Sequence, residues 1–231
     1  MLVYGKNVVS ELLKSNTHIK RLYLSDNFND ENILFKLDKN NISYERIDKN
    51  RLDKMCGNAL TQGIAAEIKD YRYLDIEDIV LDSDAKFIVM LDSLEDPHNF
   101  GAIIRTCECA GVDYIIIPKN RSVSVNATVY KTSCGAIHNV KICEVVNLSN
   151  TIRKLKDLGF WVYGAEAGGK NYKDVDLSGK VALVIGSEGR GLKNIVADSC
   201  DEIISLPMRG KINSLNASVA AGILIYEVIS R

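Results

Sequence analysis

The stretch SLPMRGKINSLNAS, residues 205–218, places two bends and a run of small polar residues between an apolar strand-like segment and an apolar helix-like one. A turn of this kind offers backbone groups to a ligand. Two other polar clusters follow apolar runs: GSEGRG at 186–191 and DPHNFGA at 96–102. Because open α/β sheets bind ligands at the carboxyl ends of their strands, the three clusters predict one shared site.

Composition is that of an ordinary globular protein. The 231 residues are 46% apolar and 26% charged, enough for one large domain or two small ones. No run of about 18 apolar residues is present, and polar residues interrupt the N-terminal stretch, so neither a membrane span nor a signal peptide is expected. The cytoplasm is therefore the expected compartment. Six cysteines without metal-ligand spacing to histidine are expected to be buried free thiols, with no metal bound.

Net charge argues against a uniformly basic surface. The chain has 29 basic and 30 acidic side chains, a formal charge of −1, whereas nucleic-acid binders usually carry a basic surplus. Any RNA site must then be a local patch, although each basic residue taken alone is equally well a solvated surface charge. The residues proposed for such a patch are Lys119, Arg121, Lys131, Arg190, Lys193, Arg209 and Lys211.

The first 70 residues predict a small α/β unit. A helix is expected around residues 8–13 and another at 33–37, with strands at 21–24, 42–47 and 64–68. Residues 71–85 form an acidic linker, and the apolar stripe in 69–85 predicts a short helix there.

From residue 86 onward, strand-like and helix-like runs alternate, which predicts a mostly parallel sheet covered by helices. The expected strands are 87–91, 114–117, 160–165, 181–185 and 202–206. The expected helices are 99–110, 126–133, 148–158, 191–198 and 214–230.

The two standard phosphate-binding loops fit poorly. Glycines 186, 189 and 191 are spaced GxxGxG rather than GxGxxG, and Leu192 separates Gly191 from Lys193, which breaks the P-loop pattern. No glycine-rich loop follows the first strand of the second half, where a Rossmann-type methyltransferase binds its cofactor. A methyltransferase cofactor would therefore have to bind at the C-terminal turns.

Three motifs in order identify a family. They are NxGxxxR (Asn99, Gly101, Arg105), GxExxG (Gly186, Glu188, Gly191) and LPxxGxxxSLNxS (Leu206, Pro207, Gly210, Ser214, Leu215, Asn216, Ser218). Together they resemble the signature motifs of the SpoU (TrmH) family of RNA 2'-O-methyltransferases in the SPOUT superfamily. Residues 118–135 look most like the bacterial members that modify a guanosine of large-subunit ribosomal RNA.

The resemblance implies a fold that composition does not. It implies an α/β protein whose mostly parallel C-terminal sheet, residues 86–231, is tied in a trefoil knot by the last helix, and a homodimer formed through that region. Residues 1–70 resemble the L30-like domain that binds the RNA substrate. Small residues in the last helix are compatible with a knot, and equally with simple packing against the sheet.

The resemblance also implies the site residues. Gly186, Leu206 and Leu215 lie on loops whose main chain holds S-adenosyl-L-methionine. Arg105, Glu188, Asn99, Ser214 and Asn216 are the expected catalytic residues. Since a guanidinium is a very weak acid and keeps its proton, Arg105 is expected to orient the ribose phosphate and stabilise the forming alkoxide rather than take a proton. Asn99 and Ser214 are also possible helix N-caps.

The sequence therefore predicts methyl transfer from S-adenosyl-L-methionine to a ribose 2'-hydroxyl of 23S ribosomal RNA. Two alternatives stay open: the same chemistry on transfer RNA, and a non-catalytic RNA-binding ribosome-assembly factor that keeps the fold. Intact Asn99, Arg105, Glu188 and Asn216 favour catalysis.

Overall fold

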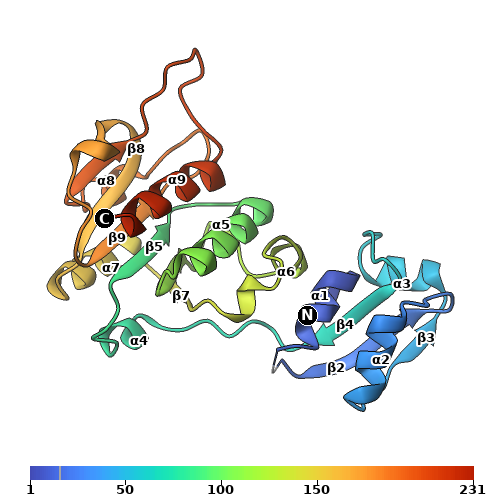
Figure 1. The fold of residues 1–231 in the computed structure, drawn as a ribbon. Coiled ribbons are helices and arrows are strands. Elements are labelled where there is room, and N and C mark those ends of the chain that lie inside the picture. The colour runs from blue at the N-terminus through green and yellow to red at the C-terminus, as the bar shows by residue number, and fades with distance from the viewer. Residues whose placement is uncertain (16) are drawn as a thin grey trace. The chain divides into compact units, whose positions relative to one another are not determined.

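The structure, a computed structural model, describes residues 1–15 and 17–231. The chain forms two compact units (Figure 1). Unit 1 contains residues 1–72 and 125–138, and unit 2 contains residues 73–124 and 139–231. Residues 125–138, which the sequence assigned to the second domain, thus pack with the N-terminal unit. The functional domain limits drawn at residues 70 and 86 remain a prediction.

Unit 1 is a four-stranded mixed sheet with helices. Its strand order is β1 (Leu2–Tyr4), β4 (Ile64–Ile68), β2 (Ile19–Ser25), β3 (Glu45–Ile47). Only the β2 and β3 pair is parallel. Its helices are α1 (Lys6–Leu12), α2 (Glu31–Lys39), α3 (Lys49–Met55) and α6 (Ala127–Thr132), with a 3-10 turn at Ala136–His138. Strand β1 and helix α3 were not predicted, because a three-residue strand and a polar seven-residue helix carry almost no periodicity.

Helix α6 and the 3-10 turn after it contact the start of the chain within unit 1. The Lys131 ammonium lies 5.8 Å from the ring centroid of Tyr4. Thr17 Oγ1 is 3.3 Å from His138 Nδ1, and burial lowers the pKa of that imidazole. Val129 is fully buried. The second segment of unit 1 is therefore part of its core.

Unit 2 is built on a six-stranded sheet in which every pair of neighbours is parallel. The strand order is β10 (Glu202–Ser205), β8 (Trp161–Asn171), β9 (Val181–Ile185), β5 (Phe87–Leu91), β6 (Tyr114–Pro118), β7 (Ile142–Val145). All residues of β5, β6 and β9 are buried, as expected of central strands covered on both faces. The predicted parallel sheet is confirmed; β7, with only four residues, was not predicted.

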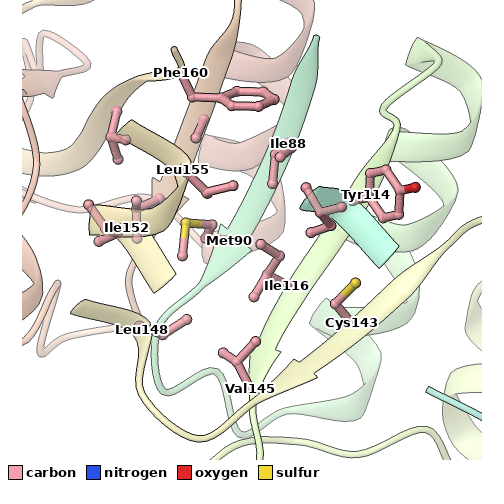
Figure 2. Close-up of a cluster of buried hydrophobic side chains, with 14 of the residues drawn as sticks. Ile88, Met90, Tyr114, Ile116, Cys143, Val145, Leu148, Ile152, Leu155 and Phe160 are labelled. Atoms are coloured by element: carbon pink, nitrogen blue, oxygen red, sulfur yellow. The ribbon is translucent and has the colours of Figure 1, made fainter. Parts of the chain in front are cut away.

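Helices cover both faces of this sheet (Figure 1). On one face α4 (Ile76–Val80), α7 (Leu148–Asp157) and α8 (Asn194–Ala197) pack onto a cluster that includes Ile88, Met90 and Ile116 (Figure 2). On the other, α5 (Pro97–Ala110) and α9 (Ala217–Ile229) lie side by side (Figure 1). Among the residues that the structure describes, no helix is long and apolar enough to cross a bilayer. The expected trefoil knot stays a prediction.

Local signals set the limits of α5. Asp96 caps the helix by accepting a hydrogen bond from the His98 amide at 2.9 Å, and Pro97 occupies the first turn. Gly111 ends the helix with φ 70°. Asn99, which the sequence left open as a cap, is not the cap, since α5 starts two residues before it and Asn99 lies in the first turn.

All six cysteines are free thiols, as expected. No group of three or more metal-ligating side chains occurs in residues 1–15 and 17–231. Burial raises the pKa of Cys143 and Cys200 to about 12 and that of Cys56 to about 11. Cys109 and Cys134 are exposed, so the expectation that every thiol is buried was wrong.

A thiol reagent is expected to separate these two classes. At pH 8 the native protein should react rapidly at Cys109 and Cys134, while Cys107 and Cys143 react only after unfolding, because the reactive thiolate is scarce and covered at buried positions. Mass spectrometry of iodoacetamide-treated protein before and after denaturation measures this. Fast native labelling of Cys143 would contradict the packing of β7.

Candidate functional site

The three polar clusters meet through one carboxylate. Glu188 Oε1 accepts hydrogen bonds from Asn99 Nδ2 at 2.8 Å, from Asn216 Nδ2 at 2.5 Å and from the Ala217 amide at 3.1 Å. Asn216 Nδ2 also donates to Asn99 Oδ1 at 2.9 Å. The site thus joins the start of α5, the loop after β9 and the start of α9, as the strand-end argument predicted.

Asn216 is the N-cap of α9. Its Oδ1 accepts from the Ser218 amide at 2.9 Å and from the Val219 amide at 3.3 Å. Its side chain therefore holds both the helix start and Glu188. Ser214 was considered as this cap; the structure assigns that role to Asn216, and Ser214 lines a cavity.

Asn99 is 6% exposed, a buried amide whose two ends are both satisfied inside the site. A buried amide without partners costs about 1–3 kcal/mol. Its hydrogen bonds to Glu188 and Asn216 thus fix its orientation, and Asn99 serves as a rigid link between α5 and the other two clusters.

A cavity of about 290 Å³ lies between the loop after β9, the loop after β10 and α9. It contains all the residues predicted to bind a cofactor, together with Ser214 and Glu188. Its wall is mostly apolar, with a few polar groups, as is typical of small-molecule sites. The lining residues are Ala165, Glu166, Ala167, Ile185, Gly186, Ser187, Glu188, Gly189, Arg190, Gly191, Ile204, Leu206, Met208, Asn213, Ser214, Leu215, Ala217, Ala220 and Leu224.

Gly186 is required by a close backbone approach. A Cβ at this position would lie 2.3 Å from the carbonyl carbon of Gly191 and 2.7 Å from the Leu192 nitrogen. The loop closes on itself at that point, since the Ser187 and Gly191 amides each donate to the other's carbonyl, at 3.2 Å and 3.1 Å. A side chain would force this turn open.

A second cavity, of about 460 Å³, shares the loop after β9 with the first. Ser187, Glu188, Arg190 and Gly191 line both cavities. Asn99 lines only the second one, beside Asp96 and Glu95. Glu188 therefore stands between a mostly apolar cavity and a more polar one, where two reactants could meet.

Arg105 lies outside both cavities. It is exposed on α5, six residues beyond Asn99, which is about 9 Å along the helix axis and about 120° around it. The structure thus joins Asn99, Glu188 and Asn216 by hydrogen bonds, places Ser214 on the first cavity with Glu188, and leaves Arg105 outside both cavities.

Two acidic residues at the site were not predicted. Asp92, directly after β5, is fully buried; it accepts hydrogen bonds from the Lys193 amide at 2.8 Å and from Lys193 Nζ at 3.2 Å. Glu166, on β8, lines the first cavity. The signal for Asp92 was present in the sequence, because a charged residue that ends a wholly apolar strand is seldom at the surface by chance.

Asp92→Asn is expected to lower the free energy of unfolding by about 1–3 kcal/mol, because the buried oxygen facing Lys193 loses its charge and part of its hydrogen bonding. Lys193→Ala should cost less than about 1 kcal/mol, since that ammonium is half exposed and the amide bond remains. Urea unfolding followed by circular dichroism measures both. An equal loss of unfolding free energy in Asp92→Asn and Lys193→Ala would contradict a role for Asp92 in holding the Lys193 amide.

The basic residues proposed to contact RNA are dispersed. Lys193 is paired with Asp92, and Lys131 belongs to unit 1. Arg190 lines both cavities, and Arg209 and Lys211 are exposed on the loop before α9. Of the proposed patch, Arg190 and Lys193 are the cations that line a cavity of the site.

Comparisons with known proteins cover nearly the whole chain. The model of the SpoU rRNA Methylase family matches residues 86–226, and that of RNA 2'-O ribose methyltransferase substrate binding matches residues 2–74. The chain is 39% identical over 234 residues to YacO of Bacillus subtilis strain 168, named as a TrmH family tRNA/rRNA methyltransferase, covering 98% of this chain and 94% of that one. A Staphylococcus haemolyticus protein named for the same family is 41% identical over 236 residues, covering 99% and 94%.

A solved structure has the same fold. The SpoU methyltransferase AviRb from Streptomyces viridochromogenes, crystallised in complex with the cofactor AdoMet, superposes with a TM-score of 0.82 at 21% identity. The superposition covers 100% of this chain and 89% of that one. At this identity the likeness concerns the fold.

Proposed function

Because the chain belongs to the SpoU rRNA Methylase family, we propose that it transfers the methyl group of S-adenosyl-L-methionine to the ribose 2'-hydroxyl of a guanosine in 23S ribosomal RNA. One observation carries this proposal: Glu188, in the second motif, lines two adjoining cavities and accepts hydrogen bonds from Asn99 of the first motif and Asn216 of the third. A site for two reactants with a polar group at their junction suits group transfer.

The first cavity is assigned to the cofactor. When bound, S-adenosyl-L-methionine supplies an electrophilic methyl group on its sulfonium. The apolar wall of Ile204, Leu206 and Leu224 suits an adenine ring, and Gly186 lets the backbone approach closely. AviRb, which has this fold, was crystallised with the same cofactor, which supports the assignment.

The second cavity is assigned to the acceptor nucleotide. Asn99 and Glu188 hold the rim where the 2'-oxygen must approach in line with the methyl group, and Ser214 offers a hydroxyl from the cofactor side. Arg105 is assigned to the ribose phosphate and to the charge that develops on the 2'-oxygen as its proton leaves. Arg105 is not assigned to take that proton, because a guanidinium is a hydrogen-bond donor with no acceptor site.

A homodimer is part of the proposal. Helix α9 exposes Val219, Ile223 and Tyr226, which are 50%, 40% and 50% exposed and spaced four and three residues apart. That spacing places them in one stripe on the helix surface. An apolar stripe on a helix that borders the site suits an interface with a second copy.

Ile223→Asp is expected to shift the protein toward the monomer and to reduce methyl transfer by at least about tenfold, because a charge in an apolar interface costs several kcal/mol unless it is paired. Light scattering after size-exclusion chromatography measures the mass. Leu60→Asp, at an exposed apolar position of unit 1, is the matched control and should change neither property. An Ile223→Asp variant that remains dimeric would place the interface elsewhere.

The substrate assignment is tested by identifying which RNA, and which nucleotide in it, receives the methyl group. Purified protein is mixed with methyl-labelled cofactor and, separately, with 23S ribosomal RNA, 16S ribosomal RNA and transfer RNA, and the labelled nucleotide is identified after nuclease digestion. We expect 2'-O-methylguanosine in 23S RNA alone. Label in transfer RNA alone would favour the transfer-RNA alternative, and cofactor binding without transfer to any RNA would favour an assembly factor.

A further inference from the structure

We propose that Glu166 binds the ribose hydroxyls of the cofactor's adenosine and so fixes the cofactor in the first cavity. This inference rests on the proposed function, which places the cofactor there. It concerns a residue that lies in none of the three sequence motifs.

The position of Glu166 on the sheet suits this role. Strands β8 and β9 are parallel neighbours, and their last paired residues are Ala165 and Ile185. Glu166 follows Ala165, while Gly186 opens the glycine-rich turn after Ile185. In parallel α/β sheets that bind nucleotides, an acidic residue at the end of one strand bonds the ribose hydroxyl while the glycine turn after another strand admits the ligand. Here Glu166 is the first residue of β8 beyond its pairing with β9, and it lines the first cavity together with Gly186.

The Glu166 carboxylate lies beside the glycine turn at the cavity wall. Its Oε1 lies 2.7 Å from the point where a Cβ on Gly191 would stand, and Gly191 has φ 67°. A side chain at residue 191 would therefore displace Glu166 as well as strain the turn. The position of Glu166 therefore gives a physical reason for glycine, rather than a larger residue, at position 191.

Glu166 also has hydrogen-bonding capacity to offer. In the described part of the chain it makes no hydrogen bond or ion pair, whereas Glu188 Oε1 already accepts three hydrogen bonds. Two carboxylate oxygens side by side can accept from two neighbouring hydroxyls. Of the two carboxylates that line the first cavity, Glu166 is the one whose oxygens are both available.

Calorimetry on the full chain without RNA tests the inference. Glu166→Gln should weaken the binding of S-adenosyl-L-methionine and of S-adenosyl-L-homocysteine by the same factor, about tenfold or more, since both carry the ribose diol and the substitution removes the charge that strengthens its hydrogen bonds. Glu166→Asp should retain part of the affinity. A loss confined to S-adenosyl-L-methionine would mean that the carboxylate faces the sulfonium charge, and would overturn the proposal.

The matched control is Glu144→Gln, on β7 at the opposite edge of the same sheet, which should bind both ligands as the unaltered protein does. Unchanged affinity of Glu166→Gln, with binding intact in the unaltered protein, would overturn the role of Glu166 and leave the cofactor cavity in place. If the unaltered protein itself bound neither ligand, the assignment of the cavity would fail, and the role of Glu166 with it. Thermal unfolding of each variant verifies that it is folded.

Discussion

Arg105→Ala is expected to slow methyl transfer by at least about a hundredfold while leaving cofactor affinity within a few-fold. The loss is that of a preorganised cation facing developing negative charge, which typically costs about 10²–10³ in rate. Affinity should persist because Arg105 lines neither cavity. Arg105→Lys should recover only part of the rate, since it keeps the charge and loses the planar fork. Single-turnover transfer to RNA measures the rate, and calorimetry with the cofactor measures the affinity.

Arg153→Ala is the matched control, because Arg153 is an exposed helical arginine on α7, and it should be as active as the unaltered protein. Full activity of Arg105→Ala would remove Arg105 from the catalytic proposal. Mixing Arg105→Ala with a variant that cannot bind the cofactor extends the test. Activity regained in the mixture would mean that Arg105 of one copy serves the cavity of the other, as its distance from Asn99 along α5 allows.

Gly186→Val is expected to weaken cofactor binding by about 10–100-fold and to abolish methyl transfer at ordinary cofactor concentrations. The first added carbon meets backbone atoms of Gly191 at 2.3 Å and 2.5 Å, and backbone cannot turn aside as a flexible side chain can. Overpacking of this kind costs about 1–3 kcal/mol, and here it distorts the loop that forms one wall of the cavity. Calorimetry with the cofactor in the absence of RNA measures the change.

Gly210→Ala is the control for Gly186→Val. It tests whether the loss of affinity comes from steric crowding or from replacing any glycine of the motifs. Gly210 belongs to a signature motif too, but its nearest contact for an added carbon is at 4.0 Å and its φ is not in the left-handed region. Its substitution should leave affinity nearly unchanged. Were Gly186→Val to bind the cofactor as tightly as Gly210→Ala does, the first cavity would not be the cofactor site.

The predictions of the sheet and of the shared site came mostly from recognising where each strand ends. Apolar runs such as 87–91 and 181–185 are strands with those same limits, because a strand buried on both faces has an unbroken apolar sequence that stops where the polar loop starts. Placing the clusters at 96–102, 186–191 and 205–218 at one edge followed from parallel topology alone. The hydrogen bonds among Asn99, Glu188 and Asn216 show that the three clusters do meet.

Other features had no local signal. Glu166 resembles any charged strand residue until β8 is aligned with β9. The grouping of 125–138 with unit 1 depends on contacts between residues distant in sequence, such as those of Lys131 with Tyr4 and of His138 with Thr17. Cap assignment failed at both helices because several cap-forming residues occur close together, and only geometry selects among Asp96, Asn99, Ser214 and Asn216.

The discontinuous make-up of unit 1 has a practical consequence for dissection of the chain. A single protease nick near Arg72 cuts the polypeptide, yet residues 125–138 stay in the C-terminal fragment while the elements they pack with lie in the N-terminal one. The two pieces should therefore co-elute under native conditions and separate only in denaturant. For the same reason, this protein is a natural starting point for a split-protein reporter, in which the two halves associate through residues 125–138, which the C-terminal half carries and the N-terminal half lacks.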